Sequence, residues 1–424
     1  MSKPPPAPTR GTAENARVVI AGWGLMTPLG ISAWATFTRL LQGCTLRDRA
    51  DELPADTTPV DLARALGCVA SVQHTRTDPA IELAERAVRE AVTMAGLDPK
   101  GLPLWLGTSK GAISNVSQCL GLGRPLDDET AQCLAMGPHA WMSHQLTRRL
   151  HTRAMGHHVA ACSSGLAALD TARRALLFSQ VEPPPYALVA SADAAITPAL
   201  VSSYQRLGVL GTVTRGAYTQ LPLDEGRQGF MLSELGAAVL LKRIEPGASL
   251  PVNCIELIDT ATACEPYDII RSPREMKSLS MLWRQISRDR TVDVVHPHAP
   301  GTREHDPAEL GALLQTPNST GQRLPDLYAV KGAVGHSLGA SGLASLVVAA
   351  MSLRSGRRPP MPWLSRPMQL PDGSRLTIDP GPRPCDRDGT HAVLAAGFGG
   401  HLAAAVLQGH GHGEAPPSSS RPQR

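Results

Sequence analysis

Aromatic residues are scarce in this chain: Phe, Trp and Tyr make up 4% of its 424 residues. No uninterrupted apolar run reaches the roughly 20 residues of a transmembrane helix, and the opening residues MSKPPPAPTR lack the apolar segment of a secretory signal. Lys and Arg (41) barely outnumber Asp and Glu (37), and the chain has no basic block of the kind that binds nucleic acid. We therefore expect no membrane span, no nucleic-acid partner and a cytoplasmic location.

Paired cysteines are also lacking. The eight cysteines form no CxxC pair and show no metal-ligand spacing, so we expect neither a zinc site nor a disulfide framework. They suit a reducing compartment. They stand at positions 44, 68, 119, 133, 162, 254, 264 and 385.

Short apolar runs alternate with helical patterns along most of the chain, which is typical of a layered α/β protein. Asp78 and Pro79 predict a helix start, because Asp caps a first turn and Pro fits the first helical position. Apolar residues then recur at helical spacing up to Gly96, a C-terminal cap. The buried strands expected in the first half are 17–21, 104–106, 187–190 and 237–241.

The second half repeats this pattern in outline after Pro251. We predict an N-terminal half over 16–250 and a C-terminal half over 251–408, with one shared core or two separate ones. Residues 1–15 and 409–424 lack apolar content and are predicted to be disordered tails. His410 and His412 could bind a metal there; a tail without metal is the simpler interpretation. The expected strands are 252–258, 292–295, 391–396 and 402–407, and the expected helices lie near 275–288, 307–315 and 338–354.

Gly22-Trp-Gly24 follows an apolar strand and invites a dinucleotide-binding interpretation. The third glycine of that fingerprint is missing, because Thr27 stands at its position and Pro28 would disturb the helix that should open there. A glycine-rich turn between the strand and a loop explains these residues better.

Cys162 stands between an apolar stretch and a helical pattern, in the segment Val159-Ala-Ala-Cys-Ser-Ser-Gly165. A thiol at a helix N-terminus lies near unpaired backbone N–H groups, which favour the thiolate and lower the thiol pKa from about 8.5. Its small neighbours leave room for a substrate. The pattern predicts a nucleophile; a small cysteine that only fills the core is the alternative when the residue is considered alone.

Two histidines follow apolar stretches in the second half of the chain. His298 comes after residues 292–295, and His336 closes the segment Lys331-Gly-Ala-Val-Gly-His336. Each is expected on a loop at the end of a buried strand, where α/β proteins build their sites. Either histidine alone would more often be a surface or core residue. Together with Cys162 they indicate one catalytic site.

In five ordered places the chain resembles the beta-ketoacyl synthases, condensing enzymes of the thiolase-like superfamily. The matching blocks surround Cys162, Leu223-Asp-Glu-Gly-Arg227 with Gly229, Phe230 and Glu234, His298, Lys331 to His336, and Gly397-Phe-Gly-Gly400. Their order agrees over residues 16 to 408. The resemblance implies a thiolase-like α/β fold, in which two similar halves form a five-layered αβαβα sandwich.

The resemblance further implies a decarboxylative Claisen condensation. Cys162 would take an acyl chain from the phosphopantetheine arm of an acyl carrier protein. His298 and His336 would then assist decarboxylation of malonyl carrier protein and stabilise the enolate. The arm arrives with the carrier protein, so no permanently bound cofactor is expected.

Further roles follow from the same resemblance. The backbone N–H groups of Cys162 and Phe398 match an oxyanion hole, and Phe398 also matches a gate between the two half-reactions. Thr302 would contact the pantetheine arm. Lys331 would act in catalysis, and Asp306 and Glu309 would help it to organise the histidines; a purely structural ionic network is an equal alternative for these three residues. These positions lie in the matching blocks or directly beside them.

The chain departs from the family pattern in three places. Ala299 and Pro300 replace a Gly-Thr pair, which removes one hydroxyl that would hold the arm. His401-Leu402 replace a Thr-Asn pair that would brace the Phe398 loop, and Leu235 replaces a glycine. These changes suggest a specialist in polyketide, polyene or unusual fatty-acid assembly.

Two other functions are alternatives to condensation. A noncatalytic partner subunit, of the chain-length-factor kind, would bind carrier protein without chemistry; such partners normally lose the active cysteine, which is present here. A degradative thiolase needs a second reactive cysteine near the C-terminus, and Cys385 lies upstream of the Gly397–Gly400 loop in a Pro-rich segment. The resemblance also implies a dimer, with a second copy or with a related chain.

Overall fold

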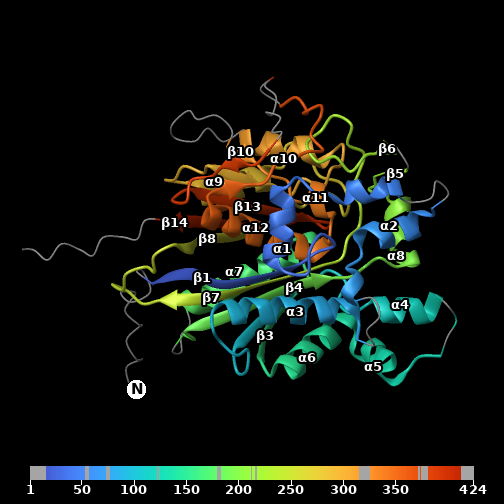
Figure 1. Ribbon diagram of the computed structural model, residues 1–424, viewed down its shortest axis with the longest axis horizontal. Helices are drawn as coiled ribbons and strands as arrows, with labels where there is room; N and C mark the ends of the chain where they lie inside the picture. The colour runs from blue at the N-terminus through green and yellow to red at the C-terminus, as the bar shows by residue number, and fades with distance from the viewer. Residues whose placement is uncertain are drawn as a thin grey trace, which may run out of the picture.

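The structure, a computed structural model, describes residues 16–411 apart from 53–56, 73–76, 122, 124, 179–182, 212, 215–216, 315–324, 371–372 and 374–380. The predicted N-terminal tail and most of the C-terminal one, His412 included, lie outside these residues. The described residues form two halves of similar design (Figure 1), and each half is built around five strands.

The strands of both halves follow the same spatial order. In the first half the order is β3-β2-β4-β7-β1, and in the second it is β10-β9-β13-β14-β8. Counted within its own half, each series runs third, second, fourth, fifth, first. The N-terminal strands are β1 (Arg17–Met26), β2 (Pro103–Gly107), β3 (Arg153–His158), β4 (Tyr186–Asp193) and β7 (Leu235–Ile244). The C-terminal strands are β8 (Cys254–Cys264), β9 (Val294–His296), β10 (Asp326–Leu327), β13 (Thr390–Gly397) and β14 (His401–His410).

The first strands of the two halves join the sheets. β1 and β8 pair antiparallel at Val19 with Glu256 and at Ile20 with Ile255, which makes one ten-stranded arrangement. The predicted boundary at residue 250 falls between β7 and β8. The largest buried cluster takes residues from both halves, so the two share a continuous core. Two short hairpins complete the strands: β5 (Val213–Thr214) with β6 (Ala217–Tyr218), and β11 (Arg357–Arg358) with β12 (Arg383–Pro384).

Helices form the other three layers. α7 and α12 contact each other and strands of both sheets, so they make the central layer. α3 and α6 cover the outer face of the N-terminal sheet, and α9 and α10 cover that of the C-terminal one (Figure 1). The expected five layers are therefore present. The helices are α1 (Ala33–Leu41), α2 (Pro59–Gly67), α3 (Pro79–Met94), α4 (Ser114–Gly121), α5 (Asp128–Met136), α6 (Pro138–Leu150), α7 (Ser164–Phe178), α8 (Pro198–Arg206), α9 (Lys277–Ser287), α10 (His305–Leu314), α11 (Lys331–Val334) and α12 (Ser341–Ser355).

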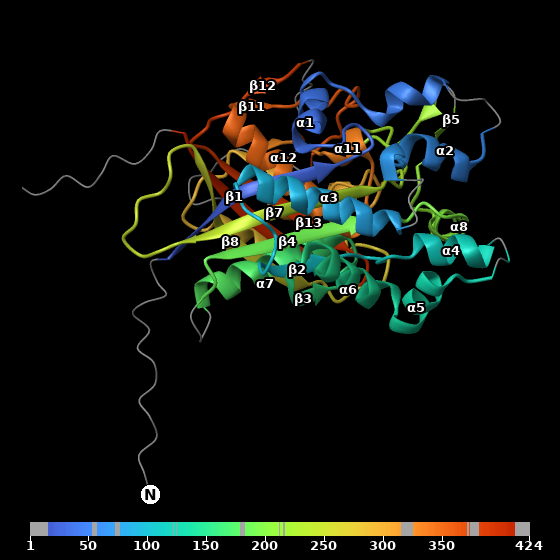
Figure 2. The ribbon, with the colours of Figure 1, turned by 60° about the horizontal axis from the view of Figure 1, so that its bottom comes forward.

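The central helix α12 explains the most apolar stretch of the chain. In the described part, Leu338–Ser355 is long and apolar enough to cross a membrane, but 89% of it is buried inside the protein. A helix enclosed on all sides is apolar all round, because it has no solvent face to supply polar residues. This segment is the core helix of a sandwich. Figure 2, turned by 60°, shows α12 beside β1, one of the strands that it contacts.

The capped helix predicted after residue 78 is confirmed. The Asp78 carboxylate accepts the Ala80 N–H at 3.0 Å, Pro79 opens α3, and Gly96 follows its end with a positive φ of 68°. Gly22 and Gly24, predicted in a turn, instead lie inside β1, which continues to Met26. A Cβ at either glycine would lie 2.0 Å from a backbone oxygen of α3. These glycines therefore permit close packing of a helix on a strand, not a turn.

The C-terminal end of the fold lies further along the chain than predicted. His410 was placed in a tail, but it is the last residue of β14 and pairs with Cys254 of β8. Its Nε2 lies 3.0 Å from the carboxylate of Glu256, which Arg17 also contacts. Strand pairing with β8 and the contact with Glu256 hold His410 in place, although the composition around it predicts disorder.

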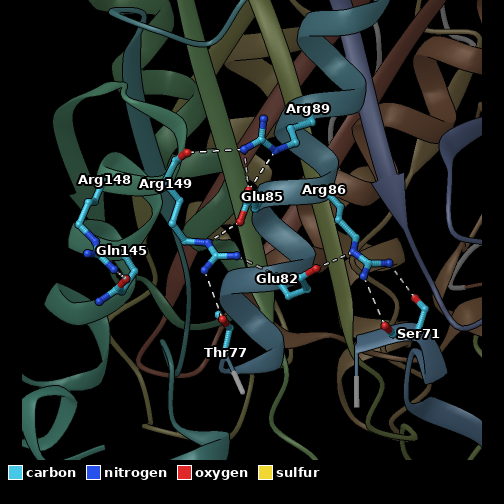
Figure 3. Close-up of polar contacts among 9 residues, drawn as sticks. All are labelled: Ser71, Thr77, Glu82, Glu85, Arg86, Arg89, Gln145, Arg148 and Arg149. Atoms are coloured by element: carbon cyan, nitrogen blue, oxygen red, sulfur yellow. Dashed lines mark hydrogen bonds and ion pairs between the residues drawn. The ribbon is translucent and has the colours of Figure 1, made fainter. Parts of the chain in front are cut away.

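An ionic network ties α3 to α6 on the outer face of the N-terminal sheet (Figure 3). Arg149 of α6 contacts both Glu82 and Glu85 of α3, and Arg89 contacts Glu85 at 2.7 Å. Arg86 pairs with Glu82 one turn along. Burial alone would raise the pKa of Glu85, but the hydrogen bonds from Arg149 and Arg89 outweigh it and lower that pKa.

We predict that Arg149→Ala lowers the free energy of unfolding by about 1–3 kcal/mol, because Glu85 keeps only the more exposed Arg89. Arg148→Ala is the matched control, since Arg148 contacts only the Gln145 side chain at 3.3 Å among the described contacts of this face. Urea unfolding at neutral pH measures both. Equal losses in the two variants would contradict the role given to Arg149.

Candidate active site

Cys162 lies in a tight turn between β3 and α7. A 3-10 turn over Ala161–Ser163 leads directly into α7, and Ala161 has a positive φ of 46°, which a non-glycine residue rarely adopts. Ser163 and Ser164 hold this turn, because both hydroxyls donate to carbonyls of the preceding residues at 2.7 Å. The sequence thus places the thiol at the start of a helix on a rigid, strained corner.

The second half contains a turn of the same kind. Residues Leu338–Ala340 form a 3-10 turn, Leu338 has a positive φ of 47°, and α12 follows at once. The two turns touch, and a Cβ at Gly165 would lie 3.0 Å from the Gly339 carbonyl oxygen. Cys162 is therefore held where the two halves of the molecule meet.

A cavity of about 670 Å³ reaches Cys162. The predicted residues that line it are Cys162, His298, Thr302, His336 and Phe398. The remaining wall comes from several separate parts of the chain, and its residues include Tyr204, Arg206, Phe230, Arg271, Ser272, Arg303, His305 and Leu338. The structure therefore brings the predicted thiol and both predicted histidines to one space.

His298 and His336 face each other edge to face, with ring centroids 5.4 Å apart. Phe230 packs against His336 at 4.8 Å, and the Ser341 hydroxyl lies 2.8 Å from His336 Nδ1. Both rings are buried. Burial, followed by the positive charge of Lys331, lowers the pKa of each histidine well below its usual range, so both are neutral imidazoles at working pH.

Glu309 holds the backbone of the His298 loop. One carboxylate oxygen accepts the His298 N–H and the other accepts the Ala299 N–H, each at 2.7 Å. This clamp fixes the turn in which Ala299 adopts a positive φ of 29°. Lys331 closes the loop from the other side, because its Nζ donates to the His298 carbonyl. Carboxylate and ammonium thus position His298 from its backbone.

Asp306 and Lys331 are charged groups in the interior. Asp306 accepts the Leu223 N–H at 2.9 Å and the Gly301 N–H at 3.0 Å, so it joins the middle block of the chain to the His298 loop. Burial lowers the pKa of Lys331 to about 8, although Glu309, Cys162 and Asp306 favour its charge. None of Lys331, Asp306 and Glu309 is among the residues that line the cavity.

The thiol of Cys162 differs from the sequence-based expectation. Its side chain is 7% exposed, and burial raises its pKa to about 12, although Lys331, Lys110 and the Phe398 backbone N–H favour the thiolate. The helix N-terminus predicted a lowered pKa. Desolvation of a buried sulfur is larger than these favourable contacts, and a sequence pattern does not reveal how deeply a residue is buried.

Thr302 lies on the cavity wall, and its hydroxyl already has a local partner. Oγ1 accepts the His305 N–H at 3.2 Å at the start of α10, while the Thr302 carbonyl accepts a hydrogen bond from Arg227. Pro300, which stands in place of a family threonine, lines the same cavity without a hydroxyl. One oxygen lone pair and the hydroxyl proton of Thr302 stay available to a ligand.

The Phe398 loop is braced by a segment that the sequence pattern did not indicate. Gly399 donates its N–H to the Ile269 carbonyl at 2.7 Å, and Glu265 donates its N–H to the Gly400 carbonyl at 2.8 Å. The loop between β8 and α9 thus supplies backbone contacts beside His401, where the family pattern has polar side chains. Tyr204 packs near Phe398, with ring centroids 6.4 Å apart.

Several residues of the site had no role assigned from the sequence, although Phe230 stands in the matching middle block. Tyr204, Phe230, Ser272, His305 and Ser341 line the cavity or contact its histidines. Phe230 and His305 stand in or beside blocks singled out for other residues, so their position was the only available signal. Tyr204 and Ser272 lie in segments without a motif. Among the described residues, no group of three or more His, Cys, Asp or Glu is arranged to hold a metal ion.

The buried histidines predict acid sensitivity. Burial lowers the pKa of His391 from 6.5 to about 3 and lowers those of His296, His298 and His336 well below 6.5. The unfolded chain takes up these protons below about pH 6.5 while the folded chain does not, so stability falls as pH falls through that window. For His391 alone the upper limit is about 5 kcal/mol. Urea midpoints at about pH 7.5 and about pH 5 test this; equal midpoints would contradict it.

Family models match most of the chain. The N-terminal domain of the beta-ketoacyl synthases matches residues 15–246, and their C-terminal domain matches residues 273–364. The chain belongs to the beta-ketoacyl synthase family. Its relatives within the family are distant in sequence, as the departures at Ala299, Pro300 and His401 lead one to expect.

Two curated relatives span nearly the whole chain. The tetracenomycin polyketide synthase ketoacyl synthase alpha subunit of Streptomyces glaucescens is 26% identical and covers 92% of this chain and 96% of its own length. The 3-oxoacyl-[acyl-carrier-protein] synthase 2 of Coxiella burnetii (strain RSA 493 / Nine Mile phase I) is 23% identical and covers 93% and 99%. One of these family members is named for polyketide synthesis and the other for synthesis of 3-oxoacyl-[acyl-carrier-protein].

Solved ketosynthases share the fold. A type II PKS acyl-carrier protein in complex with its ketosynthase, bound to the hexaketide, aligns with a TM-score of 0.75 at 18% identity, over 93% of this chain and 100% of that one. The ishigamide ketosynthase/chain length factor aligns with a TM-score of 0.73 at 19% identity, over 94% and 100%. The predicted thiolase-like fold is confirmed.

Proposed function

We propose that this beta-ketoacyl synthase family member is an active condensing enzyme, in which Cys162 carries the acyl group and His298 and His336 act on the malonyl unit. One observation supports this most: a thiol and two neutral imidazoles line the same cavity. Family membership supports the reaction class, and the named relatives support polyketide or fatty-acid assembly as its setting.

In the first half-reaction, Cys162 Sγ attacks the thioester carbonyl of an acyl carrier protein. A carbon–sulfur bond forms to Cys162, the bond to the phosphopantetheine sulfur breaks, and the thiol proton leaves with that sulfur. Burial keeps Cys162 protonated at rest, so the proton departs during the attack. The N–H groups of Cys162 and Phe398 are the donors that we assign to the developing oxyanion, since the latter already contacts the sulfur.

In the second half-reaction, the malonyl unit loses carbon dioxide and its electron pair becomes an enolate. The enolate carbon attacks the Cys162 thioester, the carbon–sulfur bond breaks, and the released thiolate takes up one proton. We assign His298 and His336 as donors to the enolate oxygen, each worth about 3 kcal/mol. Lys331, Glu309 and Asp306 position the His298 loop from outside the cavity in this proposal.

Ser341 supports this role of His336. Its oxygen accepts the Ser337 N–H at 3.0 Å, and it lies 2.8 Å from His336 Nδ1. The Ser341 hydroxyl proton is therefore assigned to the hydrogen bond with Nδ1, and the imidazole proton to Nε2. A neutral imidazole held in this tautomer can donate from Nε2 to a substrate oxygen.

The phosphopantetheine arm is a substrate in this proposal and comes with an acyl carrier protein. Thr302 offers it a hydroxyl, and Arg206, Arg271 and Arg303 line the same cavity, which suits a phosphate on the arm and an acidic carrier. No permanently bound cofactor is required. The eight free cysteines suit a cytoplasmic location.

We further propose a dimer, with a second copy of this chain or with a related ketosynthase-like chain. β3 is an edge strand with one neighbour in the sheet. Met155 within it and Val159 directly after it are 52% and 54% exposed. An edge strand with apolar side chains is a surface that proteins normally cover. Mass photometry of the chain alone distinguishes the two forms, because only self-pairing gives a dimer without a partner.

The condensing function is tested by incubating the protein with acyl carrier proteins that bear chains of different length, followed by malonyl carrier protein. Intact and peptide mass spectrometry should locate an acyl adduct on Cys162 that is released as a chain two carbons longer. Cys162→Ala should form no adduct. Cys264→Ala, which removes an exposed cysteine, is the matched control and should behave as the unaltered protein.

A noncatalytic partner subunit is the second candidate function. The observation that favours it is the arm-binding loop, in which Ala299 and Pro300 carry no hydroxyl and Thr302 caps α10. A silent subunit acquires no acyl group on Cys162, alone or with a related synthase. Absence of any adduct under both conditions would therefore favour this candidate over the condensing enzyme.

A further inference from the structure

A third histidine lines the cavity beside the proposed catalytic pair. His305 is the first residue of α10 and is 8% exposed, and its ring packs edge to face on His298 with centroids 5.0 Å apart. Its Nδ1 lies 2.7 Å from the Ser272 hydroxyl, on the loop between β8 and α9. His305 thus connects a cavity-lining loop to His298.

Each histidine of this pair has one ring nitrogen with an incomplete set of polar contacts. In the described part of the chain, His298 Nδ1 and His305 Nε2 are buried ring nitrogens without a hydrogen-bond partner. His305 Nε2 lies 3.5 Å from a carboxylate oxygen of Glu309, too far for a good hydrogen bond. Buried polar atoms are normally satisfied, so two such nitrogens in one cluster need a functional explanation.

The proposed condensation needs one proton in each turnover, and these nitrogens can pass a proton on. Acyl transfer to Cys162 is balanced in protons, because the thiol proton leaves with the carrier sulfur. Condensation consumes one proton in each turnover, since carbon dioxide leaves and the Cys162 thiolate must be protonated. His298 and His336 are almost fully buried, and His305 packs on His298 at the wall of the same cavity, so one route for this proton leads through His305.

We propose that His305 is a positioning residue for His298 that also supplies it with this proton from the cavity. The inference rests on the condensing function proposed above. His305 gives a proton to one ring nitrogen of His298 while the other ring nitrogen gives its proton to the released sulfur, so the His298 ring stays neutral. His305 then regains its proton from water in the cavity. Ser272 orients the His305 ring through Nδ1.

The test separates the two half-reactions in His305→Ala and His305→Gln. Cys162 acylation should stay within about twofold of the unaltered protein in both, while condensation should fall about tenfold or more, because only condensation needs a net proton. Free imidazole should restore condensation in His305→Ala several-fold, since the shortened side chain leaves room for it. His144→Ala, which removes an exposed histidine of α6, should change neither step and should not respond to imidazole.

Three results would overturn the proposal: condensation unchanged in both variants, acylation reduced as far as condensation, or no imidazole rescue of His305→Ala. If His305→Ala fails to fold, the acylation and condensation rates of His305→Gln decide. Failure of the condensing function itself is distinguishable, because the unaltered protein would then neither acylate nor condense. A solvent isotope effect on condensation that disappears in His305→Gln would add independent support.

Discussion

Replacing His336 with alanine should lower the condensation rate by at least about 100-fold and leave Cys162 able to accept an acyl group. The neutral imidazole is the donor assigned to the enolate oxygen, and Phe230 and Ser341 hold it in place. Acylation needs Cys162 and backbone donors, so it should survive. Single-turnover experiments with acyl carrier protein and then malonyl carrier protein measure both steps.

Ser341→Ala is the matched variant, because it removes the partner of His336 Nδ1 and keeps the imidazole. It should lower condensation by about tenfold, through loss of the preferred tautomer and not of the donor itself. If His336→Ala condenses as fast as the unaltered protein, the assigned role of His336 is wrong. If acylation falls with condensation, the substitution has disturbed the Cys162 turn instead.

Much of the fold was predictable because local patterns decided it. The caps of α3, the buried strands at 187–190 and 237–241 and the enclosed helix α12 all follow from short-range spacing. The end of β14 was not predictable, because residues 409 and 410 belong to a polar, Gly-rich stretch. Their place in a strand depends on the partner strand β8, which is distant in sequence.

The candidate site shows the same difference between features set by local sequence and features set by tertiary contacts. Cys162, His298 and His336 were located from residue type and place in the order of the chain, and the structure brings them to one cavity. The protonation of Cys162 was predicted wrongly. The direction of the Cys162 pKa shift depends on desolvation, which is a property of the assembled core. A helix N-terminus is visible in a sequence, whereas burial of the sulfur is not.

His305 illustrates the remaining gap. The residue stands in the His298 segment that the sequence pattern singled out, but its significance depends on Ser272, 33 positions away, and on the packing of His298 against it. Side-chain contacts of this kind come from tertiary structure. Sequence patterns identify the reactive groups of such a site, while the groups that orient them depend on the fold.

Gly397→Ala should remove both half-reactions. A Cβ at Gly397 would lie 2.7 Å from the Ala160 carbonyl oxygen and 2.9 Å from the Cys162 nitrogen, so the end of β13 must move away from the nucleophile turn. That movement separates the Phe398 N–H from the Cys162 sulfur and spoils the proposed oxyanion hole. We expect acylation of Cys162 to fall by about 100-fold or more, at a stability cost of about 1–3 kcal/mol.

Gly381→Ala is the matched control, because an added Cβ there meets no atom within 4 Å in the part of the chain that the structure describes. It should keep full acylation and an unchanged unfolding midpoint. The Gly397→Ala substitution thus tests the two candidate functions without altering a reactive side chain. Acylation by a condensing enzyme depends on the distance between β13 and the Cys162 turn. A silent partner subunit has no acylation to lose. A folded Gly397→Ala protein that acylates at the normal rate would show that the Phe398 backbone contributes nothing to acyl transfer.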